Sequence, residues 1–426
     1  MRGTPYIAIA LLIFAVSAQA TENSYPDLPP HEQVDAAISN HITVLNAETG
    51  IKIEQVNQRK WESGNYEFNL RAGSARREVM NSNISKERDS TKLKEWDVAL
   101  ERPLRLINKV IIDYDIGAEV VTRANLALGD ARHEAGRTLL HLWFNWQREQ
   151  AQVSQWQQQV ENLLQQVQTT EKRLLAGDAP RMELSQAKAA VAQATVSLQQ
   201  AKMRAELAGN ELARQFPLIS LPQKLTSSKP QPIPENFDYW KQTILNDNHE
   251  LELVRSERRI QQKLAQRSRA DRLPDPTVGV RYSNEMGGNE KVTGIYLSIP
   301  LSFGLRGANA ENAEYQALIA ADRESAVERR LEGDIYAAHT QALSSYQIWL
   351  QAREAAASIR QNSDLVSHAY SLGESSLSET LTARRLALES NLSENLTRLD
   401  ANEARYRLLL DAHQLWISDP DPHGAH

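Results

Sequence analysis

The chain has 426 residues, a net charge of −6 at neutral pH and no cysteine. The absence of cysteine excludes disulfides, thiol catalysis and cysteine-based metal sites together. A mild negative charge without any block of basic residues also argues against a nucleic-acid partner.

Residues 1–20 have the pattern of a secretory signal peptide. A positive start at Met1-Arg2 precedes an apolar core over residues 6–16, and Ala18-Gln19-Ala20 form an A-x-A cleavage site. The apolar run is shorter than the ~20 residues that a membrane-spanning helix needs. We therefore expect an exported chain whose mature part begins near Thr21.

Two strands are predicted next, at about 65–79 and 93–103. Apolar and polar residues alternate along both, as in Tyr66, Glu67, Phe68, Asn69, Leu70 and Arg71, and again in Trp96, Asp97, Val98, Ala99, Leu100 and Glu101. A period of two is typical of strands with one apolar and one polar face.

A long helical hairpin is predicted over about 107–215. No proline occurs from Ile107 to Leu175, and at ~1.5 Å per residue a continuous helix of that length would reach ~100 Å. After a break at 177–180, where Asp178 is a candidate helix cap, small and apolar residues return at coiled-coil spacing. They are Leu184, Ala187, Val191, Ala194, Leu198, Ala201, Ala205, Ala208 and Leu212.

The second half of the chain repeats this arrangement after a proline-rich linker at 217–240. Strands are predicted at about 276–284 and 292–301 and a helical hairpin at about 305–416, with Leu381, Leu388 and Leu392 among the seam residues of its second arm. A flexible tail is expected at 418–426. In the second turn, Ser376 and Glu379 have the spacing of a capping box.

Local matches at nearly one separation identify an internal duplication. Gly177-Asp178 matches Gly373-Glu374, and residues 100–104 (LERPL) match residues 297–301 (LSIPL). We interpret 21–216 and 241–417 as two copies of one structural unit.

Four strands of this kind indicate an oligomer if they enter a membrane. They are close to the ~10 residues of a membrane-spanning strand, and a barrel needs at least ~8 strands. Several chains would therefore have to combine their strands; the alternative is a pair of surface hairpins on a soluble core. In a barrel, the polar positions would face the lumen: Glu67, Asn69, Arg71, Asp97, Glu101 and Arg281.

Four segments, through their combination and their order along the chain, resemble the TolC family of outer-membrane efflux proteins. They are 273–279 (LPDPTVG), Ile299-Pro300-Leu301 followed by 304–307, 175–177 (LAG) and 370–377 (YSLGESSL). The resemblance implies an α+β membrane protein, in which three chains form a 12-stranded β-barrel continued by a periplasmic α-helical coiled-coil barrel. The segment 273–280 is most similar to the heavy-metal-efflux (CzcC-like) branch.

The same resemblance implies the setting and the sites. The chain would be a homotrimer in the outer membrane of a Gram-negative bacterium, in contact with outer-membrane lipid. It would receive substrate from an inner-membrane pump, of the RND type, through a periplasmic adaptor. The adaptor would dock at the two hairpin tips, formed by Gly177, Asp178, Leu372, Gly373, Glu374 and Ser375. Asp178 and Glu374 are candidates for the periplasmic aperture.

No motif for catalysis, a cofactor or a metal centre is found. The sequence contains no G-x-S-x-G, no P-loop and no H-E-x-x-H, and its ten histidines are scattered along the chain. We therefore expect no enzyme. The alternatives are a type I secretion or drug-efflux channel, a periplasmic adaptor with one hairpin between glycine-rich β-domains, and a structural coiled-coil protein without a channel.

Overall fold

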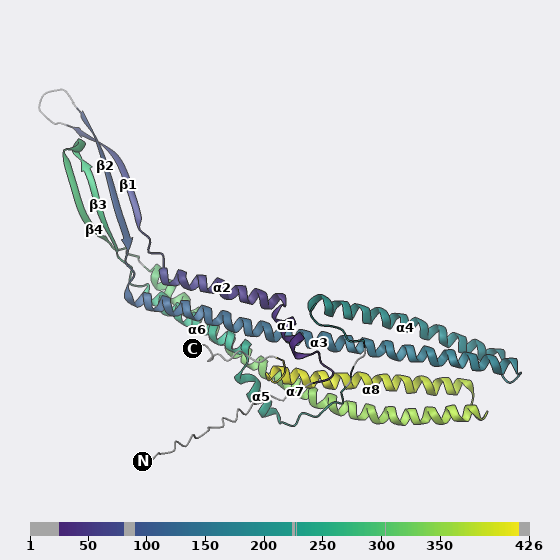
Figure 1. The fold of residues 1–426 in the computed structure, drawn as a ribbon. Helices are drawn as coiled ribbons and strands as arrows, with labels where there is room; N and C mark the ends of the chain where they lie inside the picture. The colour runs from purple at the N-terminus through teal and green to yellow at the C-terminus, as the bar shows by residue number, and fades with distance from the viewer. Residues whose placement is uncertain (1–24, 81–89, 224–225, 227, 303, 417–426) are drawn as a thin grey trace, which may run out of the picture.

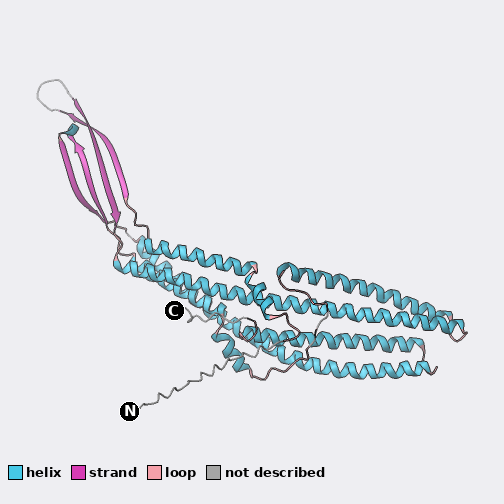
Figure 2. Cartoon of the chain, in the orientation of Figure 1, coloured by secondary structure: helices cyan, strands magenta, loops and turns pink. Residues whose placement is uncertain are grey.

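The structure is a computed structural model that describes residues 25–80, 90–223, 226, 228–302 and 304–416. The predicted signal peptide (1–20) and tail (418–426) lie outside these residues. A long helical body carries a small sheet at one end (Figures 1 and 2).

Both halves of the chain contain the same order of elements: two helices, two strands and a long helical hairpin. The first half comprises α1 (His31–Ser39), α2 (Ile42–Ser63), β1 (Asn69–Met80), β2 (Ser90–Pro103), α3 (Ile107–Leu175) and α4 (Arg181–Gln215). The second comprises α5 (Phe237–Asn246), α6 (His249–Ala270), β3 (Thr277–Glu285), η1 (Met286–Gly288), β4 (Glu290–Ser298), α7 (Leu305–Ser371) and α8 (Leu377–Asp411).

The predicted long hairpins are confirmed. Helix α3 has 69 residues and α7 has 67, which at ~1.5 Å per residue gives each about 100 Å. The alanine-rich seam of α4 is buried against α3 at Ala187, Ala194, Ala201 and Ala205. Alanine has no side chain beyond Cβ, so these positions let the two helices approach closely.

The four strands form one antiparallel sheet in the order β1-β2-β3-β4. Leu70 lies opposite Leu100, Leu100 opposite Val280, and Val280 opposite Ile295. Residues that are directly opposite share a face, so these four side chains belong to one face. The prediction was wrong at the start of the first strand, because β1 begins at Asn69 and Glu67 precedes it.

Helices α1, α2, α5 and α6 were not predicted. Helix α2 packs along α3, and α6 packs against both α3 and α7, so they thicken the helical body between the sheet and the hairpins (Figure 1). The linker boundary at 240 was also wrong, because α5 begins at Phe237 within the predicted linker.

The main apolar core lies halfway along the helical body, where α1, α3, α5 and α8 meet. Trp143, Phe144 and Tyr406 are buried there. The N-terminal segment is fixed to this core through Asp27, whose carboxylate accepts a hydrogen bond from the Tyr406 hydroxyl at 2.8 Å and whose carbonyl accepts one from Trp143 Nε1 at 2.8 Å.

A buried ion cluster joins the sheet to the helices. The side chain of Lys109, in the first turn of α3, is 0% exposed. Its Nζ donates to the carbonyl of Leu273 at 2.7 Å and lies 3.0 Å from carboxylate oxygens of both Asp271 and Asp275. Asp275 also accepts a hydrogen bond from the Tyr66 hydroxyl at 2.9 Å. The start of α3 is therefore tied to the segments that lead into β1 and β3.

Candidate functional site

The two hairpin tips have the same backbone geometry. Gly177 and Gly373 have φ values of +86° and +81°. Around Gly177, the Asp178 amide donates to the Arg173 carbonyl at 2.8 Å and the Gly177 amide to the Leu174 carbonyl at 3.1 Å. The corresponding bonds around Gly373 measure 2.9 and 3.1 Å. Both turns are Schellman motifs, which use glycine for the left-handed position.

The predicted docking residues lie at one end of the molecule, the end opposite the sheet (Figure 1). Asp178, Leu372, Gly373 and Glu374 are exposed, and Ser375 is half-buried. The predicted cap at Asp178 was wrong: the N-cap of α4 is Pro180, with no side-chain cap bond. The carboxylate of Asp178 is therefore free of that role and faces solvent.

The predicted capping box at the second tip is confirmed. Ser376 Oγ accepts a hydrogen bond from the Glu379 amide at 3.2 Å, and the Glu379 carboxylate accepts one from the Ser376 amide at 2.9 Å. The hydroxyl of Ser375 donates to the same carboxylate at 2.9 Å. The start of α8 is thus held by its own side chains, while Glu374 remains outside this network.

The two hairpins are linked to one another just before their tips. Arg173, in the last turn of α3, donates to the Tyr370 hydroxyl at 2.5 Å, and its guanidinium carbon lies 4.9 Å from the centre of the Tyr370 ring. Further along, Arg384 of α8 donates to Gln166 of α3 at 3.2 Å. These polar contacts set the separation of the two turns.

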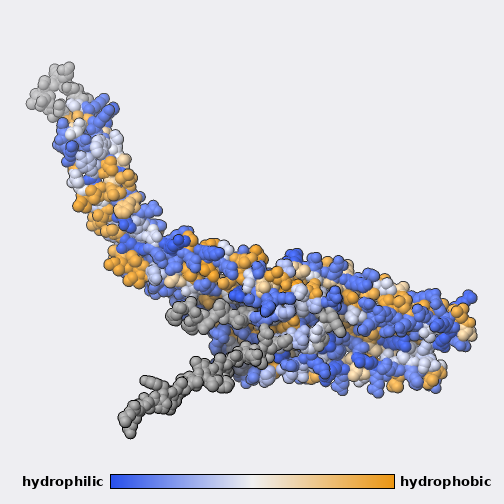
Figure 3. All heavy atoms as spheres, viewed as in Figure 1, coloured by the Kyte–Doolittle hydropathy of each residue, from blue (hydrophilic) through white to orange (hydrophobic). Residues whose placement is uncertain are grey.

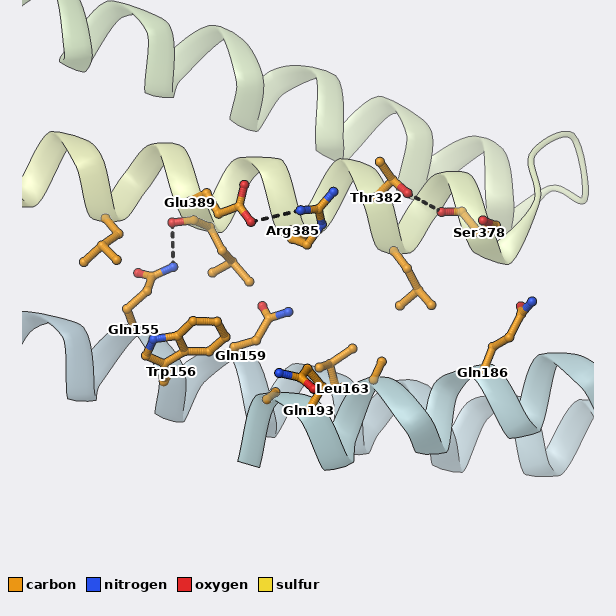
Figure 4. Close-up of a pocket in the computed structure, with 15 residues that line it drawn as sticks. Gln155, Trp156, Gln159, Leu163, Gln186, Gln193, Ser378, Thr382, Arg385 and Glu389 are labelled. Carbon is orange, nitrogen blue, oxygen red and sulfur yellow. Dashed lines mark hydrogen bonds and ion pairs between the residues drawn. The ribbon is translucent and has the colours of Figure 1, made fainter. Parts of the chain in front are cut away.

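Between the hairpins lies a groove of about 430 Å³, open to solvent (Figure 4). Gln155, Trp156 and Gln159 of α3 face residues of α8 across it. Leu381, Leu388 and Leu392, which the sequence predicted as seam residues of the second hairpin, also line the groove. The groove is therefore lined by both leucine and amide side chains.

One face of the sheet carries the predicted lumen residues. Asn69, Arg71, Asp97, Glu101 and Arg281 share this polar face by register, whereas Glu67 lies before the strand. Ion pairs cross it between Arg71 and Glu101 at 3.1 Å and between Arg281 and Asp97 at 3.5 Å. The face therefore combines both signs of charge.

The other face is apolar and uncovered. Ile295 is 81% exposed, Leu70 73% and Leu297 62%, and this side of the sheet forms the hydrophobic band of Figure 3. Trp96 and Tyr282 adjoin it, with ring centroids 5.6 Å apart. A monomer in water would not expose such a surface without a function.

Within the described residues, no helix is long and apolar enough to cross a membrane. The same residues hold no cluster of histidine and carboxylate groups arranged to bind a metal ion.

The histidines are less scattered in space than along the chain. His133 stacks on His413 with a centroid distance of 5.2 Å, and His249 lies 5.1 Å from His413. Burial, with the nearby Arg137, lowers the pKa of His133 to about 3. His133 is therefore neutral at physiological pH and packs as a core residue.

Comparison with solved structures identifies the fold. The chain is similar to the Campylobacter jejuni CmeC outer membrane channel, with 16% identity, a TM-score of 0.71 and coverage of 96% of this chain and 94% of that chain. It is also similar to the outer membrane protein VceC of Vibrio cholerae, with 14% identity, a TM-score of 0.72 and coverage of 89% of this chain and 95% of that chain. The open state of the Neisseria gonorrhoeae MtrE outer membrane channel is similar as well, with 17% identity, a TM-score of 0.60 and coverage of 90% of this chain and 89% of that chain.

The chain thus has the fold of the TolC-type outer-membrane channels, over nearly its whole length. No protein-family model matches the sequence, and no curated protein is significantly similar to it. The groove and the link between Arg173 and Tyr370 were not predicted, because both depend on how two separate hairpins lie against one another.

Proposed function

We propose that the chain is one third of an outer-membrane exit duct, which passively conducts substrate to the exterior. Three copies would combine twelve strands into a barrel and their helices into a periplasmic tunnel. The observation that carries this proposal is the sheet, whose uncovered apolar face suits lipid and whose ion-paired polar face suits a water-filled lumen. The sheet continues into helices of about 100 Å.

The partners follow from the same proposal. An inner-membrane pump, of the RND type, would deliver substrate through a periplasmic adaptor that docks at the tips around Gly177 and Gly373. The segment 273–280 favours heavy-metal cations as cargo, with drug efflux or type I secretion as the alternative. A passive duct needs no cofactor.

Fractionation with a heat-shift gel tests this function against the alternatives from other classes. The duct requires a trimer in the outer membrane that persists in unheated detergent and separates into monomers on heating. A periplasmic adaptor or a structural coiled-coil protein would instead be released with the soluble periplasmic fraction. A soluble monomer would refute the duct.

We propose that Asp178 and Glu374 border the periplasmic mouth. Both carboxylates are exposed at the tips, and three copies of each would concentrate negative charge and favour cations in a narrow passage. Single-channel recordings of the double variant Asp178→Asn/Glu374→Asn should show a reduced cation preference. Unchanged selectivity would place the constriction elsewhere.

Adaptor docking at the tips is tested at Gly373, where no atom lies within 4 Å of an added Cβ. Gly373→Trp should abolish efflux while trimers form normally, because the bulky side chain projects into the space that the adaptor would occupy. Gly333→Trp, on an exposed stretch of α7 far from the tips, is the matched control. Normal efflux by Gly373→Trp would count against docking there.

A further inference from the structure

At the strand ends farthest from the helices, the apolar face of the sheet ends in cations that have no ion-pair partner among the described residues. Arg76 lies directly opposite Lys94, and Lys291 lies opposite Asn284 at the level of Trp96. We name Arg76, Lys94 and Lys291 the cationic rim. All three side chains are exposed, and Figure 3 shows the hydrophobic band giving way to hydrophilic residues at this end of the sheet.

The rim differs from the polar face of the same sheet in how its charges are balanced. On the polar face, each arginine has a carboxylate partner: Arg71 with Glu101 at 3.1 Å, Arg77 with Glu95 at 2.7 Å, and Arg281 with Asp97 at 3.5 Å. Among the described residues, no carboxylate pairs with a rim cation. Within the part of the chain that the structure describes, the rim is therefore positive charge on the apolar side without a paired carboxylate.

At this end of the sheet the excess charge lies on two adjacent levels, that of Arg76 and Lys94 and that of Trp96 and Lys291. One residue pair farther out, Glu78 lies opposite Lys92, so that level is balanced. One pair farther in, Ser74 lies opposite Trp96, and Lys291 is the single cation on that level. Arg76 and Lys94 are like charges in direct cross-strand positions, an arrangement that destabilises a sheet unless an anion separates them. The rim is thus arranged for an external anion.

The position of the rim indicates where that anion lies. Trp96 and Tyr282 adjoin the apolar band, and such aromatic residues mark the boundary between hydrocarbon and lipid headgroups. The rim lies at this boundary or one residue pair beyond it, about 7 Å along the strand. In an inserted sheet, its side chains would reach the depth of the headgroup phosphates.

We propose that the cationic rim binds phosphate groups of anionic lipid headgroups in the outer leaflet. The proposal rests on the proposed function, because only an inserted sheet brings the rim to a leaflet. Arginine and lysine are the side chains suited to phosphate, and each cation near an anionic membrane surface contributes about fivefold in affinity. The occupant is a lipid, since the rim continues the apolar face.

Spin-label measurements on the reconstituted full-length protein test the proposal. The protein is placed in phosphatidylcholine vesicles with a trace of spin-labelled phosphatidic acid or spin-labelled phosphatidylcholine. The ratio of the two lipids held at the protein surface gives the preference. We expect the native sequence to prefer phosphatidic acid about fivefold, as for one cation in contact with a phosphate.

The variant Arg76→Gln/Lys94→Gln/Lys291→Gln should reduce this preference nearly to unity. A matched control, Lys52→Gln/Lys202→Gln/Arg329→Gln, removes the same charges from exposed positions on the helical body and should keep the preference. Equal preference for both lipids in the native sequence, or full preference in the rim variant, would overturn the proposal. A protein that fails to float with the vesicles would instead refute insertion, and with it the proposed function.

Two further experiments distinguish lipid binding from binding of free phosphate and from loss of stability. Inorganic phosphate that abolishes the preference, at an ionic strength where sodium chloride does not, would assign the rim to free phosphate and refute the lipid proposal. Arg76→Gln alone relieves the repulsion with Lys94, so its trimers should dissociate at the same or a higher temperature in uncharged detergent. Added phosphatidic acid should then raise the dissociation temperature of the native trimer more than that of the variant; an equal rise would count against the proposal.

Discussion

The buried cation at the joint between sheet and helices allows a quantitative prediction. Lys109→Met keeps the length of the side chain but removes a charge that contacts Asp271, Asp275 and the Leu273 carbonyl. The two carboxylates would then lose their shared cation. We expect the segment 271–277 to separate from the start of α3 far more often than in the native chain.

The structure sets the magnitude. Removing one partner of a buried ion pair costs about 3–5 kcal/mol. Asp271 is 41% exposed and can be hydrated, whereas Asp275 is only 18% exposed, so we expect a cost of about 3 kcal/mol, at the lower end of that range. Burial acts to raise the pKa of Asp275, but hydrogen bonds from Lys109, Tyr66 and a backbone amide outweigh it and lower the pKa. Its carboxylate is therefore charged at pH 7, well above its unfolded pKa, and the full stabilisation is present.

Hydrogen exchange measures this opening directly. A cost of about 3 kcal/mol accelerates exchange of the amides in 271–277 by about a hundredfold. The double variant Lys109→Met/Asp275→Asn should recover part of the protection from exchange, because it also removes the carboxylate charge that the single variant leaves buried without a cation. Lys202→Met, on an exposed face of α4, should change nothing. If these amides in Lys109→Met exchange within threefold of the native rate, then Lys109 does not hold the segment 271–277 against the start of α3.

The remaining predictions concern the tips and the core. Gly373→Ala should destabilise its turn by about 1 kcal/mol because φ is +81°, while Gly333→Ala within α7 should stabilise by up to about 1 kcal/mol; thermal unfolding measures both. Tyr370→Phe keeps the ring but loses the hydrogen bond from Arg173, so tip amides should exchange about fivefold to tenfold faster. His133 has a pKa of about 3, so only the unfolded chain takes up its proton as pH falls below about 6.5. The free energy of unfolding should drop by about 2 kcal/mol from pH 7 to pH 5, and His133→Phe should remove that slope.

The long helices and the strand faces could be predicted because each is encoded by a local period. Alanines of α4 at spacings of three and four are buried as the pattern indicated, and Trp96, Val98 and Leu100 share a face as alternation requires. The two turns could also be predicted, because Gly177 and Gly373 have the positive φ that is typical of a glycine at the end of a helix.

The elements that were missed are shorter helices that pack on the long ones. Helix α2 has a single buried residue, Val44, and α6 is rich in charged residues whose ion pairs reach α3 and α7. Ile260 of α6 is also buried against Ile116 and Val120 of α3, so the positions of both helices depend on long-range contacts. The histidine cluster is similar: His133, His249 and His413 meet only because three distant segments converge.

The charged residues of the sheet show why the pairing register is needed to find the partner of each side chain, which the sequence of a single strand does not give. Arg76 and Arg77 are adjacent in sequence and chemically identical, yet they lie on opposite faces. Arg77 pairs with Glu95 at 2.7 Å, whereas Arg76 faces Lys94. A slip of one residue between β1 and β2 would exchange these partners. Whether a charged side chain belongs to the ion-paired polar face or to the proposed cationic rim therefore depends on cross-strand pairing. The lumen residues could be proposed from alternation alone, whereas the rim required the structure.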